Sequence, residues 1–147
     1  MEYLGKFLLL ERQLSNGPMF VLPGGKVERF DENESEIVRE LNKDHHEYND
    51  NDVLLNTLRR ELYEELKLNL PREIDYFSSS FYMKPEGGQE ESVIDVVFYT
   101  QLRERPELVV DGKEVTSYTW MNQKEILASP QVHDWLKKAL KVFDRVP

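Results

Sequence analysis

Short apolar runs separated by turn residues dominate both ends of the chain. Ser15-Asn16-Gly17-Pro18 separates the first two runs, and Pro23-Gly24-Gly25 follows the second as a loop. The later runs are rich in β-branched and aromatic residues, and Asp111-Gly112 marks a tight turn before the last of them. The strands predicted by this pattern span residues 6–12, 19–22, 74–83, 93–102 and 117–121.

Helical periodicity appears in the middle of the chain and again near its end. In residues 53–66, Leu55, Leu58, Leu62 and Leu66 recur on one helical face, and residues 49–52 offer several N-caps. We therefore expect a helix over 53–66.

A second helix is predicted near the end of the chain, with Ser129 as its N-cap and Pro130 as its first residue. Residues 123–128 suit a short helical turn before it. We interpret its apolar stripe as core packing: Val132, Trp135, Leu136, Ala139, Leu140 and Phe143.

Three carboxylates lie along one edge of the leucine face in the central helix. At about 100° per residue, Glu61, Glu64 and Glu65 fall within roughly 100° of one another. Carboxylates this close raise each other's pKa unless a cation neutralises them, and Mg²⁺ prefers such hard oxygen ligands. The alternative is an ordinary solvated acidic face, supported by local pairs such as Arg60 with Glu64.

Composition narrows the classes of protein and partner. The length of 147 residues predicts one domain over residues 1–147, and no apolar run reaches the ~18 residues that cross a bilayer. We expect a cytoplasmic protein without a signal peptide or membrane partner, and the absence of cysteine suits a reducing compartment. A net charge of -9 argues against a nucleic-acid polymer as partner. A small phosphorylated substrate remains open, because Mg²⁺ on carboxylates can hold phosphates.

Two segments resemble the Nudix hydrolase family, whose box is GX5EX7REUXEEXGU with U a bulky aliphatic residue. The first half begins as Gly24-Gly25-Lys26-Val27-Glu28 after the strand-like residues 20–23. The second half reads Arg60-Glu61-Leu62-Tyr63-Glu64-Glu65-Leu66-Lys67-Leu68. The resemblance implies an α/β fold, an α/β/α sandwich with a mixed central sheet and a catalytic loop-helix-loop. Trp120 near the end of a late strand also fits the family.

The box departs from the family pattern in two places. Asp31 stands where the family has Glu, and residues 32–59 separate it from Arg60 where the box has seven residues, so an insertion of roughly residues 32–51 splits the box. Arg39-Glu40-Leu41 has the expected spacing, but Lys43 then occupies a ligand position, and an ammonium supplies no lone pair. Lys67 replaces the final glycine and needs a left-handed cap, at about 1 kcal/mol, or another exit from the helix.

The role of the insertion is open. An aspartate followed after seven residues by Arg-Glu-Leu occurs twice, starting at Asp31 and at Asp52. This repeat is either a duplication or an accident. The insertion's His45-His46-Glu47 is either a transition-metal site or, as we favour, a surface loop.

The resemblance also implies an activity and site roles. It implies hydrolysis of a pyrophosphate bond in a nucleoside diphosphate linked to another group, with Mg²⁺, or Mn²⁺ as an alternative. Glu61, Glu64 and Glu65 would hold the metal, with the Gly24 carbonyl as a further ligand. Arg60 would tie the helix to the glycine loop through Glu28, Asp31 or Asp52. The remaining candidates for substrate contact or catalysis are Gly25, Lys26, Glu28, Glu91 and Glu114.

The sequence leaves the general base, the role of the aromatic residues, the function and the oligomeric state open. The general base is a box glutamate, Glu90 or Glu91, or Glu114. Core packing is the default for most of the aromatic residues that could stack on a base: Phe7, Tyr76, Phe81 and Tyr82. The rival function is a non-catalytic Nudix-like module that binds a nucleotide or a partner, and a small acidic interaction domain is a third. The oligomeric state is open, with a homodimer among the options.

Overall fold

The computed structural model of the chain describes residues 1–28 and 52–143. The predictions for Asp31, for the insertion at 32–51, for Arg39-Glu40-Leu41 and for His45-His46-Glu47 lie outside these residues. The helices and strands are β1 (Glu2–Tyr3), β2 (Lys6–Leu14), β3 (Gly17–Val21), α2 (Val53–Leu66), β4 (Asp75–Glu86), β5 (Gln89–Tyr99), β6 (Val115–Asn122), α3 (Gln123–Ala128) and α4 (Asp134–Phe143).

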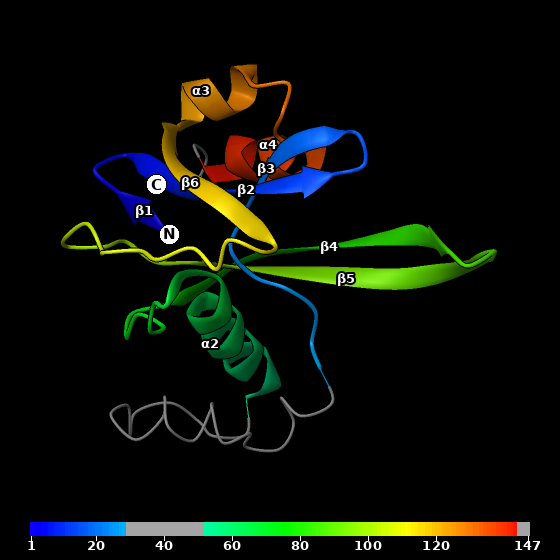
Figure 1. The fold of residues 1–147 in the computed structure, drawn as a ribbon, viewed down its shortest axis with the longest axis horizontal. Helices are drawn as coiled ribbons and strands as arrows, with labels where there is room; N and C mark the ends of the chain where they lie inside the picture. The colour runs from blue at the N-terminus through cyan, green and yellow to red at the C-terminus, as the bar shows by residue number, and fades with distance from the viewer. Residues whose placement is uncertain (29–51, 144–147) are drawn as a thin grey trace.

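Strand β2 is the centre of a four-stranded sheet (Figure 1). Strand β6 pairs antiparallel with it from Lys6 to Arg12, while β1 and β3 pair antiparallel with the two ends of its other edge. Isolated parallel bridges join Glu2 to Gln101 and Phe20 to Val132, so the pairing is mixed, as expected.

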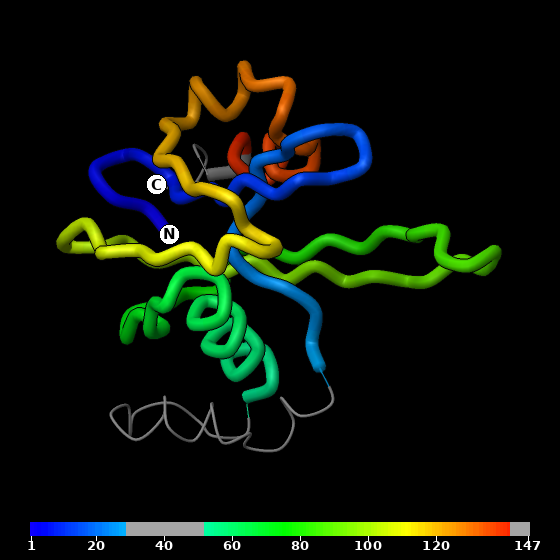
Figure 2. The backbone as a smooth tube through the Cα atoms, in the orientation of Figure 1, coloured from blue at the N-terminus to red at the C-terminus, as the bar shows by residue number. Residues whose placement is uncertain are grey.

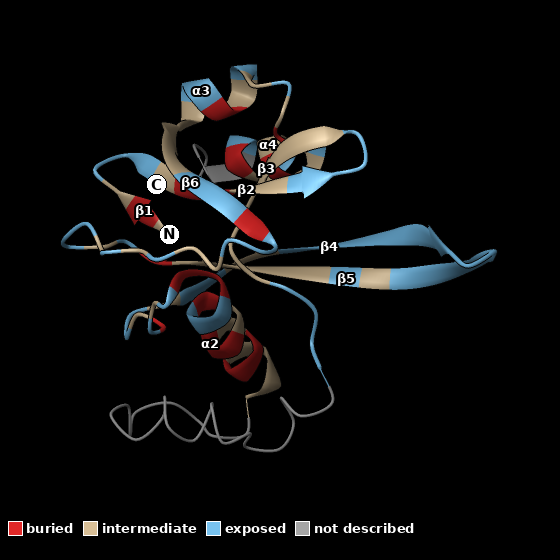
Figure 3. Cartoon of the chain, in the orientation of Figure 1, coloured by how far each residue is buried: buried red, intermediate tan, exposed pale blue. Residues whose placement is uncertain are grey.

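The side chains of β2 alternate between two hydrophobic cores. Leu8 and Leu10 point to one face and pack with Leu62 of α2, whereas Leu9 points to the other and packs with Leu136 of α4. These leucines are at most 4% exposed, and burying each contributes roughly 1.5–3 kcal/mol. Helices therefore cover both faces of the sheet (Figure 3), which confirms the predicted α/β/α sandwich.

Helix α2 has the boundaries that its sequence predicts. Its N-cap is Asp52, whose Oδ1 accepts from the backbone N–H groups of Leu54 and Leu55, each at 3.1 Å. At its other end Lys67 adopts the left-handed conformation, with φ 54° and ψ 33°, and its N–H donates to the Tyr63 carbonyl at 3.0 Å. The chain thus keeps the helix exit that a glycine normally makes.

The last two helices differ from the prediction in one respect. Residues 123–128 do form a helix, α3, with a capping box between Asn122 and Glu125. Ser129 is the C-cap of α3 and not the N-cap of the next helix, and α4 begins only at Asp134, so the start at Pro130 is wrong. The capping box fixes α3, and the chain needs residues 129–133 to turn before α4. Val132, Leu136 and Leu140 are buried as expected, while the side chain of Phe143 lies outside the described part.

Strands β4 and β5 form a long hairpin of their own, which projects from the body of the protein (Figures 1 and 2). Gly87 and Gly88 make its tight turn with φ of 60° and 83°, values that favour glycine. The default of core packing is wrong for three of its aromatic residues, because a two-stranded hairpin leaves much of its surface open to solvent. Their exposed fractions are 61% for Tyr76, 65% for Phe81 and 43% for Tyr82.

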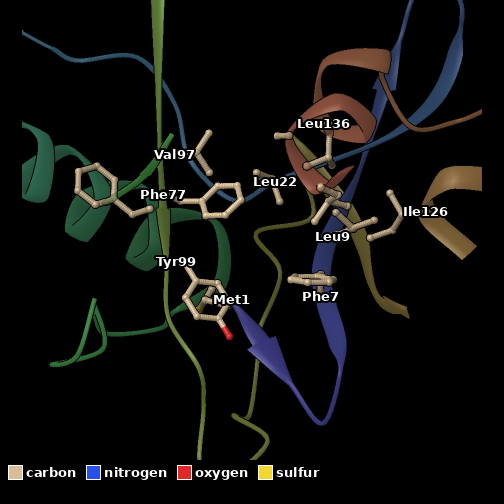
Figure 4. A pocket seen from close by; sticks show the side chains of 12 residues that line it. Met1, Phe7, Leu9, Leu22, Phe77, Val97, Tyr99, Ile126 and Leu136 are labelled. Atoms are coloured by element: carbon tan, nitrogen blue, oxygen red, sulfur yellow. The ribbon is translucent and has the colours of Figure 1, made fainter. Parts of the chain in front are cut away.

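The base of this hairpin packs on the central sheet around a small apolar cavity of about 40 Å³ (Figure 4). Phe7 and Leu9 of β2 with Leu136 of α4 lie on one side of it, and Phe77 and Val97 of the hairpin lie on the other. Phe7 is therefore a core residue, as expected. Among the helices of residues 1–28 and 52–143, none is long and apolar enough to span a bilayer.

Candidate active site

The loop at Gly24 and Gly25 lies directly against α2. Gly24 has φ of 139°, outside the usual range of side-chain-bearing residues. Gly25 is required for a steric reason, because a Cβ at this position would lie only 2.1 Å from Glu61 Oε1. The two glycines let the backbone approach the carboxylates of the helix, so the two halves of the motif meet in space although the insertion separates them in sequence.

Glu65 is the most buried of the three helix carboxylates. Its residue is 3% exposed, its Oε2 accepts from the Gly24 N–H at 3.0 Å, and its Oε1 pairs with Arg12 Nη2. The same Arg12 nitrogen donates to the Gly24 carbonyl at 3.3 Å. Arg12 comes from β2, whose polar end is thus brought beside the last turn of α2.

Arg60 holds the other two carboxylates and the glycine loop together. Its Nη1 contacts Glu61 Oε1 at 2.8 Å and Glu64 Oε2 at 3.2 Å, and its Nη2 donates to the Lys26 carbonyl at 2.9 Å. Arg60 is 4% exposed and the Glu61 side chain is 13% exposed, so their contact is shielded from water, whereas the Glu64 side chain is 48% exposed. Arg60 thus contacts both the helix and the glycine loop, and its described contact with the loop is the Lys26 carbonyl, a group outside the predicted partners Glu28, Asp31 and Asp52.

Burial dominates the electrostatics of the two inner carboxylates. It raises the pKa of Glu61 above its usual value, against the lowering effect of Arg60. It raises the pKa of Glu65 likewise, against the hydrogen bond from Gly24 and the charge of Arg12. The arginines and the backbone N–H therefore offset only part of the desolvation, and a further positive charge beside these groups would stabilise their ionised forms.

The oxygen atoms of this region suit a cation, although no metal centre is assembled. Within residues 1–28 and 52–143, no three acidic or histidine side chains come close enough to share one ion. The Gly24 carbonyl and Glu65 Oε1 nevertheless converge on a single cationic nitrogen, Arg12 Nη2. Two hard oxygens directed at one positive centre are the kind of donors that Mg²⁺ and Mn²⁺ prefer.

A cavity of about 340 Å³ opens beside the glycine loop. Gly24, Gly25 and Lys26 form one wall, and Leu58 and Leu62 of α2 lie beside them. The size is within the range of pockets that bind small molecules.

The hairpin and α4 complete the lining of this cavity. Tyr82, Lys84 and Asp95 reach it from the hairpin, and Trp135 reaches it from α4. Tyr82 and Asp95 are hydrogen-bonded to each other, and burial raises the pKa of each. The cavity therefore offers a lysine on each side, Lys26 and Lys84, together with aromatic and carboxylate groups.

The other predicted acidic residues, Glu28, Glu91 and Glu114, belong to three different segments around the site. Glu28 is an exposed residue of the glycine loop, three residues beyond Gly25. Glu91 pairs in the hairpin register with Lys84, which lines the cavity. Glu114 is exposed in a turn capped by Asp111, and the Asp111 N–H donates to the Glu65 carbonyl at 3.2 Å, so this turn docks on the C-terminal end of α2.

Sequence reasoning missed Arg12 and the cavity residues Lys84 and Asp95. The sequence marks Arg12 only as the end of a strand, and nothing local ties residue 12 to residue 65. Trp135 packs against the core as predicted and also lines the cavity. A charged residue at the end of an otherwise buried strand is a signal that could have marked Arg12, because burying an arginine without a partner is costly.

Comparison with known proteins identifies the family. The family model described as NUDIX domain matches residues 3–143. Among curated proteins, none matches the chain.

Three solved structures illustrate the shared fold. The MutT protein of Methanosarcina mazei Go1 is 22% identical, with 98% of this chain and 87% of that chain covered and a TM-score of 0.66. The NUDIX domain of Shewanella oneidensis NrtR, complexed with ADP ribose, is 17% identical over 97% and 78%, with a TM-score of 0.63. A C. elegans Ap4A hydrolase binary complex is 14% identical over 95% and 84%, with a TM-score of 0.59. The match along nearly the whole chain, on a fold that brings Gly25 against Glu61 and Gly24 against Glu65, leads to one conclusion: the chain belongs to the Nudix family of pyrophosphohydrolases.

Proposed function

We propose that this chain hydrolyses a pyrophosphate bond in a nucleoside diphosphate linked to another group, with Mg²⁺ or Mn²⁺ as cofactor. The observation that carries the proposal is the contact between the glycine loop and α2, where Glu61 packs on Gly25 and Glu65 accepts from the Gly24 N–H. Such close packing of buried carboxylates on backbone has a high desolvation cost, and a divalent cation would offset it.

The residues that would hold the cation are Glu64, Glu65, Glu61 and the carbonyl oxygen of Gly24. When bound, the ion would supply positive charge to the substrate phosphates and to the transition state, and it would lower the pKa of the attacking water. Glu64 is suited to an outer position, because its side chain is 48% exposed whereas that of Glu61 is 13% exposed.

The chain's own residues supply orientation, charge and proton transfer. Arg60 holds Glu61 and Glu64 in one arrangement through a single nitrogen and fixes it to the loop through the Lys26 carbonyl. Burial raises the pKa of Glu61 above its ordinary value in the metal-free protein, and a bound cation would act in the opposite direction. We propose that a glutamate of the helix not engaged by the metal serves as the general base, with Glu91 and Glu114 as the alternatives from later loops.

The cavity beside the loop is our proposed place for the substrate. Lys26 and Lys84 approach it with positive charge for phosphates, and Trp135 offers an aromatic face to the remaining group. The related structures support a nucleotide derivative as substrate, since their names refer to ADP ribose and to Ap4A hydrolysis. Nucleoside triphosphates and nucleotide sugars belong to the same chemical class.

The second candidate is a module that binds a nucleotide without hydrolysing it. One observation favours it, because Arg12 and Arg60 already contact all three carboxylates, and an internal cation can make a metal unnecessary. In that case the ion pairs between the two arginines and the three carboxylates would stabilise the fold without binding a metal.

A hydrolysis screen distinguishes the two candidates. Nucleoside triphosphates, ADP-ribose, dinucleoside polyphosphates and nucleotide sugars would be incubated with the protein and Mg²⁺, and products followed by ³¹P NMR. We expect turnover of at least one compound, lost in Glu64→Gln and Glu65→Gln and retained in Glu125→Gln, a carboxylate of the α3 capping box. If none of these compounds is hydrolysed while nucleotide binding is retained, the result would contradict the proposed hydrolase and support the binding module.

A further inference from the structure

A second hollow lies on the sheet, apart from the cavity at the glycine loop. It has a volume of about 430 Å³ and is lined by Tyr3, Leu4, Lys6, Arg105, Tyr118 and Trp120. None of these residues lines the cavity beside Gly24. Lys6 and Arg12 are six positions apart on β2, which corresponds to about 20 Å along a strand. The two sites are therefore separate.

The residues that line this hollow carry positive charge, whereas the chain as a whole is acidic. Its lining contains two cations and no carboxylate, although the chain has 28 acidic and 19 basic residues. Within residues 1–28 and 52–143, neither Lys6 nor Arg105 forms an ion pair. Both residues are exposed, so their charge is available to an anionic group that enters the hollow.

Aromatic rings make up the floor between these cations. Tyr118 and Trp120 point to the same face of β6, two residues apart, and Tyr3 meets Trp120 edge-to-face with ring centroids 6.3 Å apart. The Arg105 guanidinium carbon lies 5.8 Å from the Trp120 ring centroid. Tyr118 is 36% exposed, so part of its ring is accessible for stacking.

The backbone around the hollow is well fixed. The Leu102 N–H donates to the Glu2 carbonyl at 2.8 Å, which holds the segment before Arg105 beside β1 (Figure 1). Strand β6 pairs with β2 on one edge, and no described strand pairs with its other edge at Thr119, which also lines the hollow. Unpaired strand edges offer N–H and carbonyl groups to a ligand.

Leu4 at the rim has two unfavourable properties. It is 81% exposed, and it has φ of 50°, a conformation that suits glycine or asparagine better. The backbone conformation belongs to the two-residue turn Leu4-Gly5 between β1 and β2, in which Gly5 also has a positive φ of 74°. The exposure of Leu4 leaves an apolar side chain at the rim that a ligand could cover.

We propose that this hollow is a second, metal-independent binding site for a nucleoside phosphate. The base would stack on the aromatic floor at Tyr118 and hydrogen-bond to the free edge of β6, and the phosphate would lie between Lys6 and Arg105. The volume is in the range of small-molecule pockets, and stacking platforms combined with cations are a common way to bind nucleotides. No divalent cation is needed here, because the protein itself supplies the positive charge.

The test is calorimetric titration of the full chain with AMP in EDTA, with adenosine and inorganic phosphate as separate probes. We expect AMP to bind more tightly than either fragment. The double variant Lys6→Gln/Arg105→Gln should weaken AMP binding by at least about tenfold, as expected for the loss of two charge-assisted contacts. Tyr118→Ala, at an exposed position that does not endanger the fold, should weaken it by about fivefold or more, the lower end of base stacking energies.

A matched control separates this site from bulk charge. Lys113→Gln/Lys124→Gln removes the same charge from exposed positions elsewhere and should leave the AMP affinity unchanged. Undetectable AMP binding in EDTA, or an affinity unaffected by Lys6→Gln/Arg105→Gln, would overturn the proposal. Equal affinity for inorganic phosphate and AMP would overturn its nucleotide part.

Discussion

Replacing Gly25 by alanine tests the contact between the two halves of the motif. The added Cβ would lie 2.1 Å from Glu61 Oε1, 2.3 Å from its Cδ and 2.6 Å from Oε2. Because ordinary contact begins at 3.4 Å, the carboxylate must retreat by about 1.3 Å. Glu61 is held by Arg60 at 2.8 Å, so this movement breaks the contact or drags Arg60 away from the Lys26 carbonyl.

The expected effect is small on stability and large on catalysis. Losing one charge-assisted hydrogen bond lowers the free energy of unfolding by about 1–2 kcal/mol. Displacing a catalytic group by about 1 Å lowers the rate by about 100-fold. Urea unfolding would measure the first quantity, and Mg²⁺-dependent hydrolysis of the substrate found in the screen would measure the second.

Two further variants make the result interpretable. Gly5→Ala adds the same methyl group at a positive φ of 74° with nothing within 4 Å, so it should reduce stability but not activity. Adding Glu61→Asp to Gly25→Ala shortens the side chain and relieves the steric overlap, but it restores neither the Arg60 contact nor activity. If Gly25→Ala alone kept activity within about twofold of the wild type, the proposed role of this contact would be refuted.

Three more predictions concern the same helix. Arg12→Gln leaves the buried Glu65 carboxylate with the Gly24 N–H but without its cationic partner. Urea unfolding of the metal-free variant should therefore show a free energy of unfolding lower by about 2–3 kcal/mol. Arg103→Gln, which removes an exposed ion pair, should change this free energy little. The pKa values of Glu61 and Glu65 are raised in the folded protein, so their contribution to stability is present below the unfolded pKa of 4.5 and is lost as pH rises through the higher folded values. In EDTA, the melting temperature of Glu65→Gln should therefore rise relative to that of the wild type as pH increases from 4 to 7. A melting-temperature difference that does not change with pH would contradict this. Lys67→Gly removes a left-handed lysine and should raise the free energy of unfolding by about 1 kcal/mol, whereas Lys141→Gly inside α4 should lower it.

Local signals were sufficient wherever local interactions decide the structure. The leucine spacing and Asp52 define α2, because periodicity and capping act within a few residues. For Lys67 the sequence leaves a left-handed cap or another exit from the helix open, and the structure shows the left-handed cap. Ser129 carried an equally good local signal for a helix start, but the capping box of α3 ends that helix at Ala128 and uses Ser129 as its C-cap. A local signal thus fails when a neighbouring element uses the same residue.

The site could be predicted only in part, because some of its contacts are set by tertiary structure. Spacing from the glycines favours the earlier Arg-Glu-Leu segment, and only the charge of the residues that follow each segment selects Glu61, Glu64 and Glu65 instead. The pairing of Glu65 with Arg12 depends on how β2 lies against α2, and 53 positions of sequence separate the two residues. The exposure of Tyr82 and Phe81 similarly depends on the hairpin's position outside the sheet, which strand propensity does not encode.

Binding of Mn²⁺ tests the central claim that the carboxylates of α2 form a divalent-cation site with the glycine loop. Free Mn²⁺ would be counted by electron paramagnetic resonance while the ion is titrated into the wild type, Glu64→Gln, Glu65→Gln and the capping-box variant Glu125→Gln. We predict saturable binding in the wild type and in Glu125→Gln, and a loss of affinity of at least about tenfold in each of the other two variants. Absence of saturable binding, or equal affinity in all four proteins, would contradict the account.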